Sequence, residues 1–173
     1  MVDIIDTLKE GNSRYIERFK DELRNHVDGQ SPAIAILTCS DSRVIPEFIF
    51  DVSIGKLFIV RVAGNIAMDS SVLSSLEYAV DHLHVRYILI LGHTHCGAVK
   101  ASEGTEKTYN PLLLEIRKSF LIDPNDHIKA NLTRQLQMLP RRSTIIEGSI
   151  KQKNVTLLGA IYHLDSGQVE FLS

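Results

Sequence analysis

The sequence predicts an α/β protein in which a mostly parallel central β-sheet is flanked by helices. Short apolar runs at 33–37, 57–60, 87–91 and 155–162 alternate with longer segments of helical character. Continuously apolar runs of this length are typical of strands that are buried on both faces of a parallel sheet. Their alternation with helices indicates a layered fold with right-handed crossovers. The length fits one domain, which we place at residues 1–173.

Residues 1–28, before the first strand, have the apolar spacing of an amphipathic helix, with charged residues in between. The apolar positions are Ile4, Leu8, Tyr15, Phe19 and Leu23. We interpret this segment as a helical arm made of one or two helices. A domain of this size offers the arm little surface to cover. We therefore predict that the arm packs on a partner subunit.

The segments between the strands carry signals for helix ends and turns. Asp69 can cap a helix that extends to about Leu83, and Asn110 precedes a proline in the way typical of a helix start. A largely helical stretch should follow Asn110 to about residue 152, interrupted at Asp123-Pro124 and at Pro140. Gly167 predicts a turn that brings the C-terminal residues back toward the last strand.

Composition excludes several classes of function. The formal net charge is −2, so the chain lacks the excess of basic residues expected of a nucleic-acid-binding protein. No apolar run reaches the roughly 20 residues needed to cross a bilayer. The first six residues include Asp3 and Asp6 where a signal peptide would be basic, so we expect a cytoplasmic protein.

Three polar clusters, at 39–43, 61–65 and 92–97, each follow a predicted strand. Ligands of open parallel sheets bind beyond the carboxyl ends of the strands. We therefore expect the three clusters to converge on one crevice.

Both cysteines of the chain, Cys39 and Cys96, lie in these clusters. A cysteine pair near histidines in a cytosolic protein indicates metal binding or catalysis more than a disulfide. Two thiolates and one imidazole suit Zn²⁺ and leave a fourth tetrahedral position open. His93 and His95 lie on the same turn as Cys96, and spacing alone leaves open which of them is the ligand.

Asp41 and Arg43 are two residues apart, so on extended backbone they face the same side. Such a pair is either a surface ion pair of little consequence or a carboxylate oriented by a fixed guanidinium. Gly64, in the second cluster, either forms a structural turn or permits close approach of the backbone to the site.

With these clusters in place, the sequence resembles the β-class carbonic anhydrases over most of its length. The family pattern is Cys-x-Asp-x-Arg, then Arg-x-x-x-Asn, then His-x-x-Cys-Gly, and together the three motifs are highly specific. The matching residues are Cys39, Asp41 and Arg43, then Arg61 and Asn65, then His93, Cys96 and Gly97.

The resemblance implies a zinc-dependent enzyme. It assigns Cys39, His93 and Cys96 as ligands of one Zn²⁺ per chain, in preference to His95, with Asp41 and Arg43 as the catalytic orienting pair. The implied reaction is the reversible hydration of CO₂ to bicarbonate by zinc-bound hydroxide.

The resemblance also implies substrate-pocket residues of the plant type. These are Gln30, Phe58, Tyr78 and Gly97. In the family some of them come from the neighbouring subunit, which implies a dimer or a higher oligomer. Ile36 stands where members with a non-catalytic bicarbonate site carry tryptophan, which argues against that site here.

Other functions remain open at this point. Relatives with the same ligands hydrolyse carbonyl sulfide or carbon disulfide, and the ligand motif does not separate these substrates from CO₂. A non-enzymatic zinc- or bicarbonate-binding subunit is a further alternative, although simple zinc storage would need none of Asp41, Arg43 and Gln30. A thiol redox role for Cys39 and Cys96 is a third.

Overall fold

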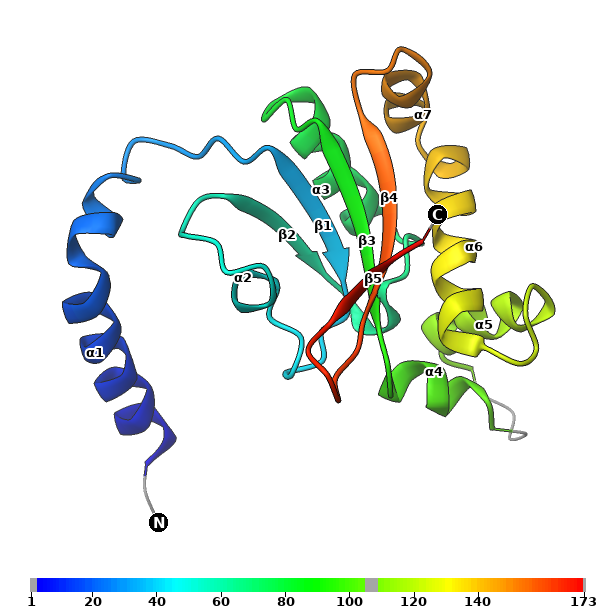
Figure 1. Ribbon diagram of the computed structural model, residues 1–173, viewed down its shortest axis with the longest axis horizontal. Helices are drawn as coiled ribbons and strands as arrows, with labels where there is room; N and C mark the ends of the chain where they lie inside the picture. Colours follow the sequence, from blue (N-terminus) through cyan, green and yellow to red (C-terminus); the bar gives the residue numbers. More distant parts are fainter. Residues whose placement is uncertain (1–2, 105–108, 173) are drawn as a thin grey trace.

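The computed structural model describes residues 3–104 and 109–172, and their centre is one five-stranded sheet (Figure 1). The strand order is β2-β1-β3-β4-β5, with the first four strands parallel and β5 antiparallel to β4. This confirms the predicted mostly parallel sheet. The strands are β1 (Ile34–Thr38), β2 (Leu57–Arg61), β3 (Tyr87–His93), β4 (Thr156–Tyr162) and β5 (Val169–Phe171).

Helices and short helical turns surround the sheet. The α-helices are α1 (Ile4–Arg24), α2 (Pro46–Ile49), α3 (Ser70–Asp81), α4 (Gly97–Ser102), α5 (Pro111–Arg117), α6 (His127–Arg142) and α7 (Thr144–Lys151), and the 3₁₀ turns are η1 (Ala63–Asn65) and η2 (Lys118–Leu121). On one sheet face, α3, α6 and α7 pack Leu76, Leu139 and Ile146 into the larger core. On the other face, the smaller core receives mainly α2 and the segment between β4 and β5.

Local signals in the sequence set several of these boundaries. The Asp69 side chain accepts a hydrogen bond from the Val72 N–H and begins α3. Asn110 does the same for α5 through the Leu112 N–H. Gly167 has a φ of 74°, a conformation that glycine adopts without strain, and it allows the turn into β5.

The predicted interruption at Pro140 is wrong. Helix α6 continues through Pro140 and ends at Arg142. Before the proline, Leu132 and Leu139 are fully buried in the larger core, and after it Arg142 donates to Glu115. Contacts on both sides of the missing N–H therefore hold the helix in place. The break comes at Ser143 instead, because its hydroxyl caps α7 by accepting from the Ile146 N–H.

The arm is a single helix, α1, which lies apart from the sheet at the end of an extended segment (Figure 1). None of its residues is buried, and Ile4, Ile5, Leu8 and Ile16 are exposed. Near its C-terminal end, Glu22 accepts a hydrogen bond from the Ile54 N–H. That the arm packs on a partner subunit stays a prediction. Among the described helices, none is long and apolar enough to cross a membrane.

Candidate metal centre

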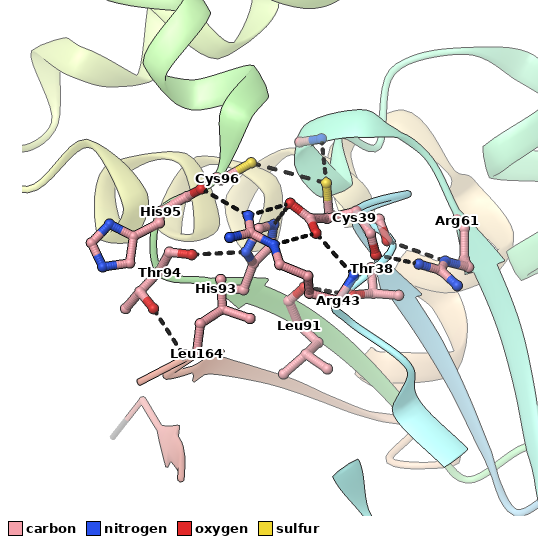
Figure 2. Close-up of polar contacts among 12 residues, drawn as sticks. Thr38, Cys39, Arg43, Arg61, Leu91, His93, Thr94, His95, Cys96 and Leu164 are labelled. Carbon is pink, nitrogen blue, oxygen red and sulfur yellow. Dashed lines mark hydrogen bonds and ion pairs between the residues drawn. The ribbon is translucent and has the colours of Figure 1, made fainter. Parts of the chain in front are cut away.

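The three polar clusters meet at the carboxyl ends of β1, β2 and β3, as their positions in the sequence predict (Figure 2). Cys39 directly follows β1, His93 is the last residue of β3, and Cys96 precedes the first residue of α4. All three are buried, and their potential ligand atoms lie within 4.8 Å of one another. This group could hold a metal ion.

The distances and hydrogen bonds of the group fit a zinc ion. Two thiolates bound to one tetrahedral Zn²⁺ lie about 3.8 Å apart, since each Zn–S bond is about 2.3 Å. Cys39 Sγ and Cys96 Sγ are 3.9 Å apart. The Nδ1 atom of His93 lies 2.9 Å from the Thr94 carbonyl oxygen, so Nδ1–H donates there, while Nε2 is buried without a hydrogen-bond partner. An orphaned buried imidazole nitrogen beside two sulfurs is the arrangement a soft metal ion requires.

The structure also separates the two histidines of the third cluster. His93 is 1% exposed and belongs to β3. His95 is exposed, has a φ of 55°, and directs its ring away from the sulfurs (Figure 2). The ligand group therefore contains His93 and not His95, which agrees with the assignment that the resemblance implied.

The two thiols shift each other's pKa values in opposite directions. The pKa of the Cys39 thiol is lowered to about 4, chiefly by the hydrogen bond with Cys96, which together with His93 and the Gly64 N–H outweighs the raising effect of burial. The same contact, together with burial, raises the pKa of Cys96. Negative charge is thus favoured on Cys39, and a divalent cation would favour it on both sulfurs.

Asp41 lies beside this group and is held by Arg43. The Arg43 backbone N–H and Nε donate to Asp41 Oδ1 at 3.0 and 2.9 Å, and Nη2 donates to Oδ2 at 2.8 Å. The hydrogen bonds from Arg43 keep the pKa of the Asp41 carboxyl well below its usual range. Asp41 Oδ2 is 3.9 Å from His93 Nε2. An ionised carboxylate with a fixed orientation therefore faces the ligand atoms.

Arg61 fixes the loop that carries both Cys39 and Asp41. Its Nε donates to the Cys39 carbonyl at 3.2 Å, and its Nη2 donates to the Asp41 carbonyl at 2.7 Å (Figure 2). The sequence placed Arg61 in the second cluster, but gave no indication that the side chain serves the first one. Parallel pairing of Thr38 with Arg61 explains the contact, since both residues end their strands at the same edge.

The Gly64 N–H reaches the site directly and donates to Cys39 Sγ at 3.2 Å. Gly64 has a φ of 69°, and a Cβ there would meet the side chain of Ile116. Both observations favour glycine, and both interpretations hold: Gly64 forms a turn within η1, and its backbone closely approaches the site.

The proposed pocket residues are not all brought to the ligand group within one chain. Gly97 directly follows Cys96 and begins α4. Gln30 precedes β1 and so lies at the opposite end of that strand from Cys39. Phe58, in β2, and Tyr78, in α3, have ring centroids 6.2 Å apart, and Tyr78 is 46% exposed. That Gln30, Phe58 and Tyr78 line a substrate pocket therefore stays a prediction.

A buried ionic cluster behind the site was missed by sequence reasoning. Glu115 of α5 accepts from Arg134 and Arg142 of α6 at 3.1 and 2.6 Å, and from Lys118 at 3.0 Å. Arg142 also donates to the Ala67 carbonyl. Burial raises the pKa of Glu115, but hydrogen bonds from Arg142 and Lys118 outweigh it and leave the pKa below its usual range. The cluster ties α5 and α6 to the segment that follows β2.

Comparison with known proteins agrees with this geometry. Residues 34–169 match the family model described as carbonic anhydrase. Carbonic anhydrase 2 of Mycobacterium tuberculosis is 35% identical over an alignment of 182 residues in length, which covers 93% of this chain and 87% of the relative. The carbonic anhydrase of Mycolicibacterium smegmatis is 33% identical, covering 96% of this chain and 90% of the relative.

Solved structures give the same result. The β-carbonic anhydrase of Coccomyxa, in complex with acetazolamide, matches with a TM-score of 0.84 at 26% identity, over 99% of this chain and 87% of that one. The fold and the Cys39, His93 and Cys96 group thus define an α/β enzyme with a candidate metal-binding site at the carboxyl edge of its sheet. The chain belongs to the carbonic anhydrase family, within its β class.

Proposed function

We propose that this protein catalyses the zinc-dependent, reversible hydration of CO₂ to bicarbonate. The observation that carries the proposal is the buried Cys39, His93 and Cys96 group with the Asp41 carboxylate directed at it. Zinc ligation alone would need no oriented carboxylate. Asp41 held by Arg43 and membership of this enzyme family therefore favour catalysis over a non-enzymatic zinc-binding subunit.

The chemistry divides between the metal and the protein. CO₂ is apolar and a weak electrophile, and a bound Zn²⁺ supplies the acidified water that this reaction needs, as is established for carbonic anhydrases. Cys39, His93 and Cys96 would hold the ion and leave one position for the reactants. Asp41 Oδ2 would accept a hydrogen bond from the attacking water, so that an oxygen lone pair faces the carbon of CO₂.

Asp41 is suited to orienting this hydrogen bond and unsuited to storing a proton. A carboxyl whose pKa is held below its usual range binds a proton weakly at neutral pH. Arg43 contributes by fixing both carboxylate oxygens. The proton released in each cycle would therefore not stay on Asp41 but pass to solvent or buffer.

We further propose that the active form is a dimer or a higher oligomer. Gln30, Phe58 and Tyr78 would serve the site of the partner subunit, and α1 would cover the partner surface. Supporting this are the exposed apolar residues of α1 and the distance of Gln30 from Cys39 along β1. One structurally similar chain, 20% identical, is described as one of two tetrameric β-carbonic anhydrases of Sordaria macrospora.

A cytoplasmic location is part of the same proposal. Both cysteines are free and buried, and neither forms a disulfide. Reduced thiols of this kind persist in the reducing environment of the cytosol.

Direct assay of the purified protein tests the proposed reaction. CO₂ hydration is followed by stopped-flow with a pH indicator, and hydrolysis of carbonyl sulfide and carbon disulfide is measured on the same sample. We expect CO₂ to give by far the highest kcat/KM. If the protein turns over carbonyl sulfide or carbon disulfide faster than CO₂, the proposed substrate is wrong. If the zinc-loaded protein acts on none of the three compounds, an enzymatic role is contradicted.

A further inference from the structure

Two amide side chains on α6 are buried behind the metal centre. Asn131 and Gln135 are 1% and 0% exposed, and their spacing of four residues puts them on one face of the helix. Gln135 Nε2 donates to Asn131 Oδ1 at 3.1 Å. Burying an amide costs free energy unless its polar atoms are hydrogen-bonded, so the pair must be satisfied by further partners.

Those partners are backbone groups of the segment that follows β2. Asn131 Nδ2 donates to the Gly64 carbonyl oxygen at 2.8 Å. Gln135 Oε1 accepts from the Ala67 N–H at 3.0 Å. Gly64 and Ala67 are buried as well, so water cannot replace these bonds. The amide pair thus fastens residues 64–67 to α6 at two points.

Gly64, which the hydrogen bond from Asn131 holds in place, is also the residue that contacts the proposed metal ligand Cys39. The Gly64 N–H donates to Cys39 Sγ at 3.2 Å. Glycine has the freest backbone of all residues, so its N–H keeps one direction only where neighbouring groups fix the peptides on either side. The Asn131 bond fixes the carbonyl on the C-terminal side of Gly64.

We propose that Asn131 and Gln135 are positioning residues of the metal centre, which keep the Gly64 N–H directed at Cys39 Sγ and thereby set the donor strength of that thiolate toward the bound metal. The inference rests on the metal centre proposed above. An N–H donated to a thiolate withdraws electron density from the sulfur and holds the ligand in place. Loss of the amide pair should therefore alter the metal–sulfur bond without removing any ligand.

Cobalt substitution gives a direct readout, because thiolate-to-Co²⁺ charge-transfer bands respond to the hydrogen bonding of the sulfur. Asn131→Leu removes the donor to Gly64, and Gln135→Met leaves Asn131 in place but unsupported. We expect the charge-transfer band of both Co²⁺-loaded variants to move to longer wavelength. We also expect Zn²⁺ affinity, measured by chelator competition, to fall about tenfold or more, because Cys39 Sγ is no longer held in position for the metal.

Leu139→Ala is the matched control. Leu139 is fully buried on the same helix, but belongs to the larger hydrophobic core, so its truncation destabilises α6 without touching Gly64. Its charge-transfer band should match that of the wild type. If Asn131→Leu does not fold, the charge-transfer band of Gln135→Met, compared with that of Leu139→Ala, tests the positioning role.

The outcomes separate this inference from the proposed function. An unchanged band and affinity in the variants, or an equal shift in Leu139→Ala, would overturn the positioning role while leaving the metal centre intact. A wild-type protein that shows no thiolate-to-cobalt band at all would instead contradict the metal centre itself.

Discussion

Arg43 binds Asp41 through both carboxylate oxygens, and this contact determines what the carboxylate can do. The pKa of Asp41 is held below its usual range, so the carboxylate remains ionised throughout the neutral and alkaline range. Its Oδ2 atom faces His93 Nε2 while its partner Arg43 faces mainly solvent. Asp41 is therefore fixed as a hydrogen-bond acceptor beside the ligand atoms.

Replacing either member of this pair should separate catalysis from metal binding. Asp41→Asn keeps the shape of the side chain but removes its charge, and Arg43→Ala removes the groups that orient it. We expect each variant to lower kcat/KM for CO₂ about 10- to 100-fold while zinc content stays at the wild-type level. Stopped-flow rates and elemental analysis of the same samples provide the measurement.

Asp81→Asn is the control for this comparison, since Asp81 is an exposed carboxylate at the end of α3. It should leave the rate unchanged. Rates near the wild-type value in both Asp41→Asn and Arg43→Ala would show that the pair has no role in the reaction.

At the scale of secondary-structure elements, the site depends on strands that end together and on helices that fasten the following loops. Parallel pairing places the ends of β1, β2 and β3 at one edge of the sheet. Behind them, Glu115 of α5 joins Arg134 and Arg142 of α6. These ionic contacts connect two helices to the segment that carries Gly64, because Arg142 also binds the Ala67 carbonyl.

The Glu115 cluster should make stability depend on pH. The pKa of Glu115 is lower in the folded than in the unfolded chain, so its contribution is present above the ordinary glutamate pKa and is lost as pH falls through the folded value. We expect Glu115→Gln to lower the free energy of unfolding by about 3 kcal/mol at pH 7, because it leaves the partly buried Arg134 and Arg142 without the buried carboxylate that pairs with them. The difference from wild type should shrink toward about pH 3.

Urea unfolding at both pH values measures this effect, and Glu147→Gln is its control. Glu147 forms a more exposed pair with Lys151 on α7, so its loss should change stability by less than about 1 kcal/mol. A Glu115→Gln variant as stable as wild type at pH 7 would mean that the cluster does not stabilise the fold.

Most of the fold could be predicted from the sequence, because strands buried on both faces leave uninterrupted apolar runs such as 87–91. The choice of His93 over His95 could not come from spacing, since it depends on backbone direction after β3. Helices α2 and α4 are too short to show periodicity. Asn131 and Gln135 gave no signal, because polar residues on a helix ordinarily indicate its exposed face.

At the scale of the whole molecule, one chain brings the ligand group together, and in the dimer proposed above a partner chain would complete the pocket. Gln30 lies beyond the far end of β1 from Cys39, and α1 leaves its apolar residues exposed. A two-fold symmetric partner would bring a second copy of each feature to the first chain. The proposal that Gln30 serves the site of the partner subunit follows from this arrangement.

Mixing two variants of lowered activity tests whether Gln30 acts across the interface. In a mixed dimer of Gln30→Ala and Asp41→Asn chains, one site regains both an intact Asp41 and an intact Gln30 if Gln30 comes from the partner. Random reassociation should then restore about a quarter of the wild-type CO₂ hydration rate. Activity no higher than that of the two separate variants would place Gln30 within the site of its own chain or outside both sites.

The central claim is that Cys39, His93 and Cys96 hold a catalytic zinc ion. Its most direct test removes the metal with a chelator and titrates Zn²⁺ back while CO₂ hydration and bound zinc are measured together. We predict that the rate rises in proportion to bound zinc and reaches its plateau at one ion per chain, and that Cys96→Ser prevents both zinc uptake and activity. Full CO₂ hydration by the metal-free protein, or by Cys96→Ser without bound zinc, would contradict the claim.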